Sequence, residues 1–262
     1  MIASRYLALW LTVSSGLALV TQGPERKVVW ADEFDVDGLP SPKRWDYDVG
    51  GSGWGNQELQ FYTRRRAENA RVENGVLIIE ARREPWEDRR FTSARLASKR
   101  KGDWTYGRIE AKARIPKGSG SWPAIWMLAT TIGPMKWPDD GEIDIMEHVG
   151  WDPGVIHGSA HTKRYHHSIH TEKTGTTQVP DASDAFHVYA VEWDAARIRW
   201  FVDDREYFSF AKESGGKDVW PFDAPFHLVL NVAVGGTWGG EKGIDEDAFP
   251  VRMEVDYVRV YQ

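Results

Sequence analysis

The sequence predicts an all-β fold, an antiparallel β-sandwich, on three observations. Short segments rich in β-branched and aromatic residues recur along the chain, with Gly, Pro and Asp between them. Two of these segments, 108–115 and 252–261, alternate between polar and apolar residues, as strands with one buried face do. The chain has no convincing long amphipathic helix. From this spacing we expect about a dozen or more strands.

The clearest expected strands can be named in chain order. They lie at 76–80, 107–115, 188–193, 197–202, 226–234 and 251–261. The chain has no repeat, no low-complexity tract and no convincing interdomain linker. A length of 262 residues with 41% hydrophobic content suits one large domain with a substantial core, which we place at 23–262.

The composition argues against two classes of protein. A net charge of −6 disfavours a nucleic-acid partner, because binding phosphate needs a basic face. The basic run 64–66 (Arg-Arg-Arg) is interpreted as a solvated loop. A mean hydropathy of −0.51 argues against a membrane protein.

Residues 1–22 are predicted to be a signal peptide. Arg5 supplies a positive start, and 6–20 is an apolar run of signal-peptide length that is short for a membrane span. We therefore expect a secreted protein. The chain has no cysteine, so disulfide bonds do not brace the exported domain.

The most informative segment is 142–147 (Glu-Ile-Asp-Ile-Met-Glu), in which three acidic residues alternate with apolar ones. On a helix, Glu142 and Asp144 would point about 200° apart and could not share a site. On a strand they share a face, but Glu147 falls on the opposite one. One extra residue, a β-bulge at Ile145-Met146, would return Glu147 to the face of the other acids, with Ile143 and one of the bulge residues beneath.

The bulged strand suits a retaining glycosidase. The outer glutamates would lie roughly 13 Å apart at Cα, and their side chains can lean inward toward the ~5 to 5.5 Å carboxylate separation of such enzymes. Asp144 between them would raise some pKa values and help to keep one glutamate protonated. Two other interpretations stay open at this point: a solvent-facing acidic edge strand, and a Ca²⁺ or other metal site.

Fourteen tryptophans point to a sugar ligand, because sugar rings stack on indole. Core packing explains most of them. Trp238 lies between two pairs of glycines and is the best candidate for exposure in a loop. Trp122 and Trp126 lie in a Pro-punctuated segment, and Asn56, close to Trp54, could bind sugar hydroxyls or cap a turn.

Several histidines follow the acidic segment. His157 and His161 would share a strand face, which invites a zinc interpretation. The chain offers no cysteine and no acidic ligand at metal spacing, so we favour a histidine that contacts sugar or tunes a carboxylate.

The segment 142–147 resembles the catalytic signature of glycoside hydrolase family sixteen, in its laminarinase (endo-1,3-β-glucanase) branch. Six further motifs match in the family's order along nearly the whole exported chain. They are 30–35 (Trp-Ala-Asp-Glu-Phe-Asp), 53–62, 107–116, 121–128 (Ser-Trp-Pro-Ala-Ile-Trp-Met-Leu), 231–238 and 255–261. The loop 152–179, which contains His167 and His170, departs most from the family pattern.

The resemblance implies a curved jelly roll with a concave substrate cleft, and a role for each matching residue. Glu142 matches the nucleophile, Asp144 the assisting acid and Glu147 the general acid/base. The implied substrate-binding residues are Asn56, Trp122, Trp126, Trp238 and His161, the last near the acid/base. No cofactor is implied for catalysis, and a structural Ca²⁺ is implied on the convex side, with Glu33, Gly75 and Asp256 as ligands.

We therefore predict a monomeric, secreted, retaining endo-1,3-β-glucanase whose substrate is a β-glucan such as laminarin. Within the family, enzymes for mixed 1,3-1,4 linkages usually lack the residue that Met146 adds, whereas agarases and carrageenases can share it. The alternatives are a mixed-linkage glucanase, a galactan hydrolase on the same fold, and a non-catalytic β-glucan-binding protein.

Overall fold

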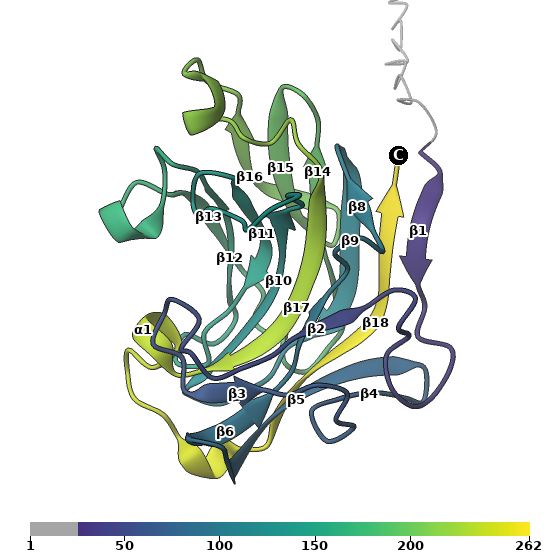
Figure 1. Ribbon diagram of the computed structural model, residues 1–262, viewed down its shortest axis with the longest axis vertical. Coiled ribbons are helices and arrows are strands. Elements are labelled where there is room, and N and C mark those ends of the chain that lie inside the picture. The colour runs from purple at the N-terminus through teal and green to yellow at the C-terminus, as the bar shows by residue number, and fades with distance from the viewer. Residues whose placement is uncertain (1–25) are drawn as a thin grey trace, which may run out of the picture.

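The computed structural model describes residues 26–262 and shows two packed, curved β-sheets (Figure 1). The predicted signal peptide, 1–22, lies outside the described residues. The all-β prediction is confirmed, and helical structure is confined to η1 (His167–Ile169), η2 (Gly216–Asp218), α1 (Gly236–Gly239) and η3 (Glu246–Ala248) among the residues described. None of these helices is long and apolar enough to cross a membrane.

One sheet has ten strands. Its path, in spatial order, is β16 (Arg205–Ala211), β15 (Arg197–Val202), β14 (His187–Trp193), β9 (Gly107–Arg114), β18 (Val251–Tyr261), β5 (Val76–Trp86), β6 (Arg89–Ser93) and β3 (Gln60–Tyr62). Two strands lie off this path: β1 (Val28–Asp32) pairs with β18, and β4 (Ala70–Glu73) pairs with β5. Pairing is antiparallel except between β3 and β6, which run parallel.

The other sheet has eight strands and carries the acidic segment. Its order is β13 (Lys173–Gln178), β12 (Val155–His161), β11 (Glu142–Glu147), β10 (Ser121–Ala129), β17 (Phe226–Val234), β7 (Arg95–Ala97) and β2 (Asp46–Asp48). The strand β8 (Asp103–Trp104) pairs with β17 off this path. In Figure 1 the long strands of this eight-stranded sheet bend around a concave side, and α1 and η1 lie at the rims of that side.

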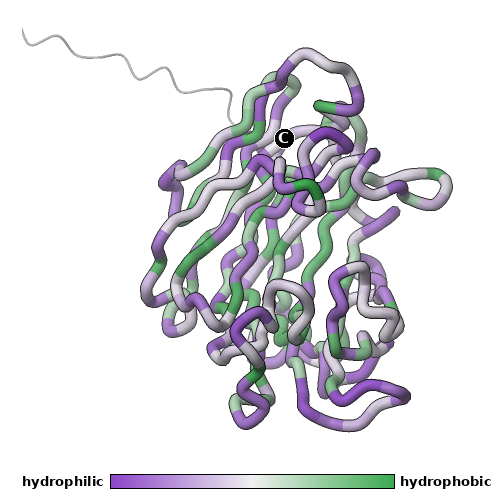
Figure 2. The backbone as a smooth tube through the Cα atoms, turned by 90° about the vertical axis from the view of Figure 1, so that its left-hand side faces the viewer, coloured by the Kyte–Doolittle hydropathy of each residue, from purple (hydrophilic) through white to green (hydrophobic). Residues whose placement is uncertain are grey.

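The hydrophobic core lies between the two sheets. Each alternating strand turns its apolar residues inward, so hydrophobic and polar residues alternate along the backbone tube (Figure 2). Ile143, Ile145 and Met146 of β11 belong to this core, and Trp200 of β15 is fully buried in it. The Trp200 indole N–H donates to the backbone carbonyl of Asp144 over 2.7 Å, which ties the two sheets together beneath the acidic strand.

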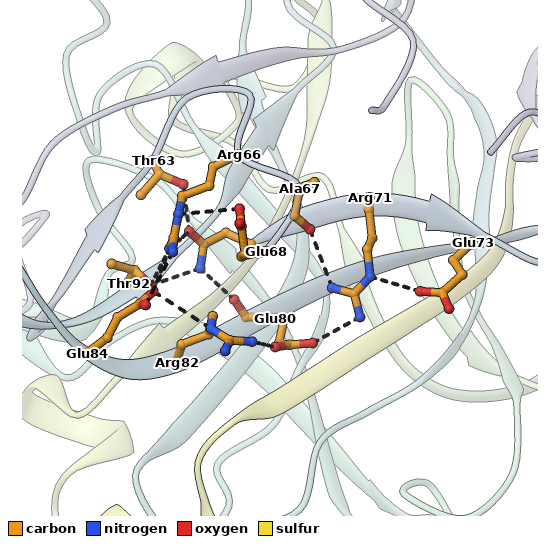
Figure 3. A network of polar contacts seen from close by, with 11 residues as sticks. Thr63, Arg66, Ala67, Glu68, Arg71, Glu73, Glu80, Arg82, Glu84 and Thr92 are labelled. Atoms are coloured by element: carbon orange, nitrogen blue, oxygen red, sulfur yellow. Dashed lines mark hydrogen bonds and ion pairs between the residues drawn. The ribbon is translucent and has the colours of Figure 1, made fainter. Parts of the chain in front are cut away.

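A buried polar network fixes the loop that joins β3 to β4. Asn69 is completely buried and makes four hydrogen bonds with Thr63, Arg66, the Glu80 carbonyl and Thr92. Figure 3 shows how the neighbouring arginines and glutamates of β4 and β5 continue this network. A buried amide with all its partners holds an irregular segment in one conformation.

Candidate active site

The predicted β-bulge is present in β11. On the β10 side, Ile125 pairs with Met146 and Trp126 pairs with Asp144, so Ile145 is the extra residue. On the β12 side the register also shifts between Asp144 and Glu147. The bulge brings Glu142, Asp144 and Glu147 onto one face, as the spacing of the acids predicts.

Both bulge residues point into the core, whereas the sequence places only one of them there. Ile145 is 1% exposed and Met146 is fully buried. Because Asp144 and Glu147 flank the bulge on the concave face, the two residues between them turn away from that face together. The strand is therefore anchored by three apolar side chains, and the acids above them have little freedom to move.

The neighbouring strand β12 supplies a partner opposite each acid. His161 lies opposite Glu142, Ser159 opposite Asp144 and His157 opposite Glu147. The His161 Nε2 lies 3.1 Å from Asp144 Oδ2 and 3.8 Å from Glu142 Oε1. The resemblance implies that His161 lies near the acid/base, but the structure places it at the nucleophile end, in contact with Asp144.

Each outer glutamate accepts a hydrogen bond from an indole. The Trp122 Nε1 donates to Glu147 Oε1 over 3.0 Å, and the Trp137 Nε1 donates to Glu142 Oε2 over 3.0 Å. A neutral N–H donor stabilises a carboxylate without adding a positive charge to the site. The two predicted catalytic groups are thus held by matching donors from opposite ends of β11.

Burial sets the protonation of the three acids. Desolvation raises the pKa of Glu142 well above its ordinary value, and the Asp144 charge adds to this shift. Burial, followed by the Glu147 charge, raises the pKa of Asp144 in the same way. The pKa of Glu147 is also raised by burial, against the lowering effects of His161 and the Trp122 hydrogen bond. A carboxyl group that stays protonated near neutral pH can act as a general acid.

The predicted aromatic residues lie around these acids. The Trp122 and Trp238 rings meet edge to face at 5.4 Å, and Trp238 meets His157 in the same way at 4.8 Å. Asn56 lies in the adjoining loop, where its carbonyl accepts the Thr237 backbone N–H over 2.8 Å. These contacts place Trp238 and Asn56 beside the Glu147 end of the strand.

Trp126 lies on the other side of the acids, toward β17. Its Nε1 donates to Asn231 Oδ1 over 2.7 Å, and the Asn231 amide donates to the Tyr62 hydroxyl over 3.0 Å. The same hydroxyl donates to Glu58, whose pKa is raised by burial. This chain of polar groups gives the concave face donors and acceptors suited to sugar hydroxyls.

The sequence did not predict four residues of this site: Glu58, Trp137, His157 as the partner of Glu147, and Arg95, which lies 4.7 Å from the Trp126 ring centroid. Glu58 had a usable signal, because Glu58, Gln60 and Tyr62 alternate at the period of a strand. Trp137 had little, because it lies in an irregular loop and reaches Glu142 only through the fold.

Two groups of residues bear on metal binding. Among the described residues, Glu142, Asp144 and His161 bring ligand atoms within 4.8 Å of one another, but two of these are the predicted nucleophile and its assisting acid. At the predicted Ca²⁺ site, Glu33 forms a two-pronged pair with Arg259, and Asp256 lies 2.7 Å from Lys112. Both carboxylates already have a cation, so their side chains do not form an open acidic cradle.

The comparisons with known proteins agree with this geometry. Residues 57–259 match the model of glycosyl hydrolases family 16, so the chain belongs to that family. A beta-glucanase of Rhodothermus marinus is 56% identical over 98% of this chain and 94% of its own length.

Solved structures give the same result. The laminarinase of Rhodothermus marinus has a TM-score of 0.89 and 58% identity, covering 92% of this chain and 99% of that one. SCLam, a non-specific endo-β-1,3(4)-glucanase from the same family, has a TM-score of 0.87 and 47% identity over 92% of both chains.

Proposed function

We propose that this protein is a retaining endo-1,3-β-glucanase that hydrolyses internal linkages of β-glucans such as laminarin. The observation that carries the proposal is the bulged strand β11, which holds Glu142, Asp144 and Glu147 on one face of the concave sheet. The family and its glucanase relatives supply the substrate class.

The reaction uses two carboxyl groups in two steps. Glu147 starts protonated and gives its proton to the glycosidic oxygen, while Glu142 attacks the anomeric carbon and the bond to the leaving group breaks. The resulting ester joins the sugar to Glu142. In the second step Glu147 takes a proton from water, the water oxygen bonds to the anomeric carbon and the ester bond breaks.

Asp144 lies on β11 between Glu142, the nucleophile, and Glu147, the general acid/base. Its carboxyl group contacts the His161 imidazole at 3.1 Å, and its charge raises the pKa of Glu142. No metal takes part in these steps, because the two carboxyl groups supply both the nucleophile and the proton.

The 1,3 linkage is favoured over mixed linkages by the extra residue in the bulge. SCLam is described as acting on both kinds of glucan, so the preference needs a direct measurement. A panel of laminarin, lichenan, agarose and carrageenan, with reducing ends as readout, distinguishes the alternatives. Release of reducing ends chiefly from laminarin supports the proposal, and activity confined to agarose or carrageenan contradicts it.

Chemical rescue separates the two glutamates. We expect Glu142→Ala to lose laminarin hydrolysis and Glu147→Ala to lose about 10²- to 10⁴-fold in kcat, both without unfolding. With an activated aryl glycoside and azide, Glu142→Ala should form the α-glycosyl azide and Glu147→Ala the β-glycosyl azide. Azide can attack directly only where the nucleophile is missing, so the opposite pairing, or near-native activity of either variant, would refute the assignment.

We further propose that the protein is exported and acts as a monomer. Export rests on the signal-peptide pattern of 1–22, and Edman sequencing of the secreted protein tests it. Light scattering tests whether the protein is a monomer. We propose no nucleic-acid partner, because the net charge of −6 disfavours binding to phosphate.

A structural Ca²⁺ at Glu33, Gly75 and Asp256 remains part of the proposal, with backbone oxygens as its main ligands. The ion pairs of Glu33 and Asp256 compete with it. Elemental analysis of the purified protein, and its melting temperature with EDTA or Ca²⁺, test this site.

A further inference from the structure

Trp137 lies in the loop between β10 and β11, directly beside the predicted nucleophile. Trp137 is 39% exposed, which is unusual for a tryptophan, yet its indole N–H donates a hydrogen bond to Glu142 Oε2 over 3.0 Å. The other oxygen, Oε1, lies 3.8 Å from the His161 Nε2, beyond hydrogen-bond distance. The two oxygens of one carboxylate therefore have different surroundings.

We propose that Trp137 is a positioning residue that selects Oε1 of Glu142 as the attacking oxygen; this inference rests on the proposed function. A carboxylate can attack through either oxygen, and a hydrogen bond to one of them fixes the rotation of the group. With Oε2 held by the indole, Oε1 bonds to the anomeric carbon. Oε2 then becomes the carbonyl oxygen of the ester and keeps its donor.

The same hydrogen bond assists the second step. When water breaks the ester, the electron pair of the breaking bond returns to the Glu142 carboxylate. The indole N–H stabilises that returning charge, because a hydrogen bond to a carboxylate favours its charged form. The donor therefore helps Glu142 both as nucleophile and as leaving group.

The histidine-rich loop around η1 holds Trp137 in place. The His167 ring lies 5.0 Å from the indole at 34°, and the His166 ring lies 5.5 Å away, edge to face. On the other side, Asp140 accepts the Lys136 backbone N–H over 2.8 Å and pairs with Lys217, which fixes the Trp137 loop. The indole is therefore held between the loop 152–179 and the ion-paired Asp140.

The test replaces only the donor. Trp137→Phe keeps an aromatic ring and removes the N–H, and Trp30→Phe is the matched control, because Trp30 also loses one indole hydrogen bond, to the Lys101 carbonyl, on a strand of the other sheet. We expect Trp137→Phe to lower kcat on laminarin about 10- to 100-fold with little change in KM. The acidic limb of kcat/KM should move to higher pH, since Glu142 loses a donor that favours its charged form.

The charged and titratable groups around Glu142 are Asp144, Glu147, Arg95 and His161, and His166 and His167 lie against Trp137. A His167→Ala variant separates the effect of the neighbouring histidines from the titration of Glu142. We expect His167→Ala to lower kcat less than Trp137→Phe does and to leave the acidic limb where it is. A shift of that limb in His167→Ala equal to the shift in Trp137→Phe would overturn the assignment to the indole donor.

A second variant guards against a change in packing. Benzothienylalanine at position 137 replaces the indole N–H by sulfur in a ring of nearly the same shape, and it should reproduce the loss seen in Trp137→Phe. Wild-type rate and pH profile in this variant would overturn the inference even if Trp137→Phe is inactive. Failure of the wild-type protein to hydrolyse any β-glucan would instead overturn the proposed function, so the two failures are distinguishable.

Discussion

Gly158 of β12 gives a sharp test of how the core positions the acids. A Cβ atom at this residue would lie 2.4 Å from Trp200 Cδ1 and 2.4 Å from the Tyr207 hydroxyl. Carbon atoms in contact are ordinarily about 3.5–4.0 Å apart, so Trp200 would have to move by about 1 Å. Trp200 holds the Asp144 carbonyl through its indole N–H, and Gly158→Ala therefore pushes on the acidic strand itself.

The expected cost follows from overpacking a closed core. A forced shift of this kind destabilises a protein by about 1–3 kcal/mol. For a domain of this size that corresponds to a fall of about 2–12 °C in melting temperature. If Asp144 and its neighbours move with Trp200, kcat on laminarin should also fall, by up to about 100-fold, because misplacement by about 1 Å is that costly.

Thermal unfolding and laminarin kinetics are measured on Gly158→Ala beside Gly133→Ala. A Cβ at Gly133 meets no atom within 4 Å, so we expect this control to match the wild type within about 0.5 kcal/mol. Wild-type stability and wild-type kcat in Gly158→Ala would show that the two sheets do not meet as tightly as the structure indicates.

Two further predictions concern stability. Asn69→Ala should lower the free energy of unfolding by about 2–4 kcal/mol in urea, because it removes a hydrogen bond from three buried partners and from the half-buried Arg66; exposed Arg83→Ala should change it by less than about 0.5 kcal/mol, and equal losses would refute the role of the network. Asp144→Asn should raise the melting temperature at pH 8 more than at pH 4. The pKa of Asp144 is raised by burial, so its charged form is disfavoured in the folded state and stability is lost as pH rises through the folded pKa. A melting temperature gained equally at both pH values would contradict this.

The fold was predictable because polar and apolar residues alternate along its strands. Segments such as 108–115 alternate with period two, and β9 turns its apolar residues to the core as expected. The parallel pair of β3 and β6 was not predictable, because register between distant strands is set by three-dimensional packing. Gln60 and Phe91 lie far apart in sequence, and neither carries a local signal for its partner.

The site was predictable where its residues share one strand. The bulge in β11 follows from the spacing of Glu142, Asp144 and Glu147 alone, and the structure has it. The placement of His161 was not predictable, because a histidine on the next strand can face any of the three acids until the register between the strands is known. Trp137 reaches Glu142 from a loop, and loops are where sequence periodicity says least.

Indole donors orient both glutamates of β11 without placing a positive charge against either of them. A guanidinium or ammonium group against Glu147 would hold it ionised and remove its proton at neutral pH. Arg95 is instead paired with Asp48, and its guanidinium lies over the Trp54 and Trp126 rings, at 4.6 and 4.7 Å from their centroids. Burial raises the pKa of both Glu142 and Glu147, so neutral N–H donors orient the two carboxyl groups and still leave the site able to hold the proton that an ionic partner would remove.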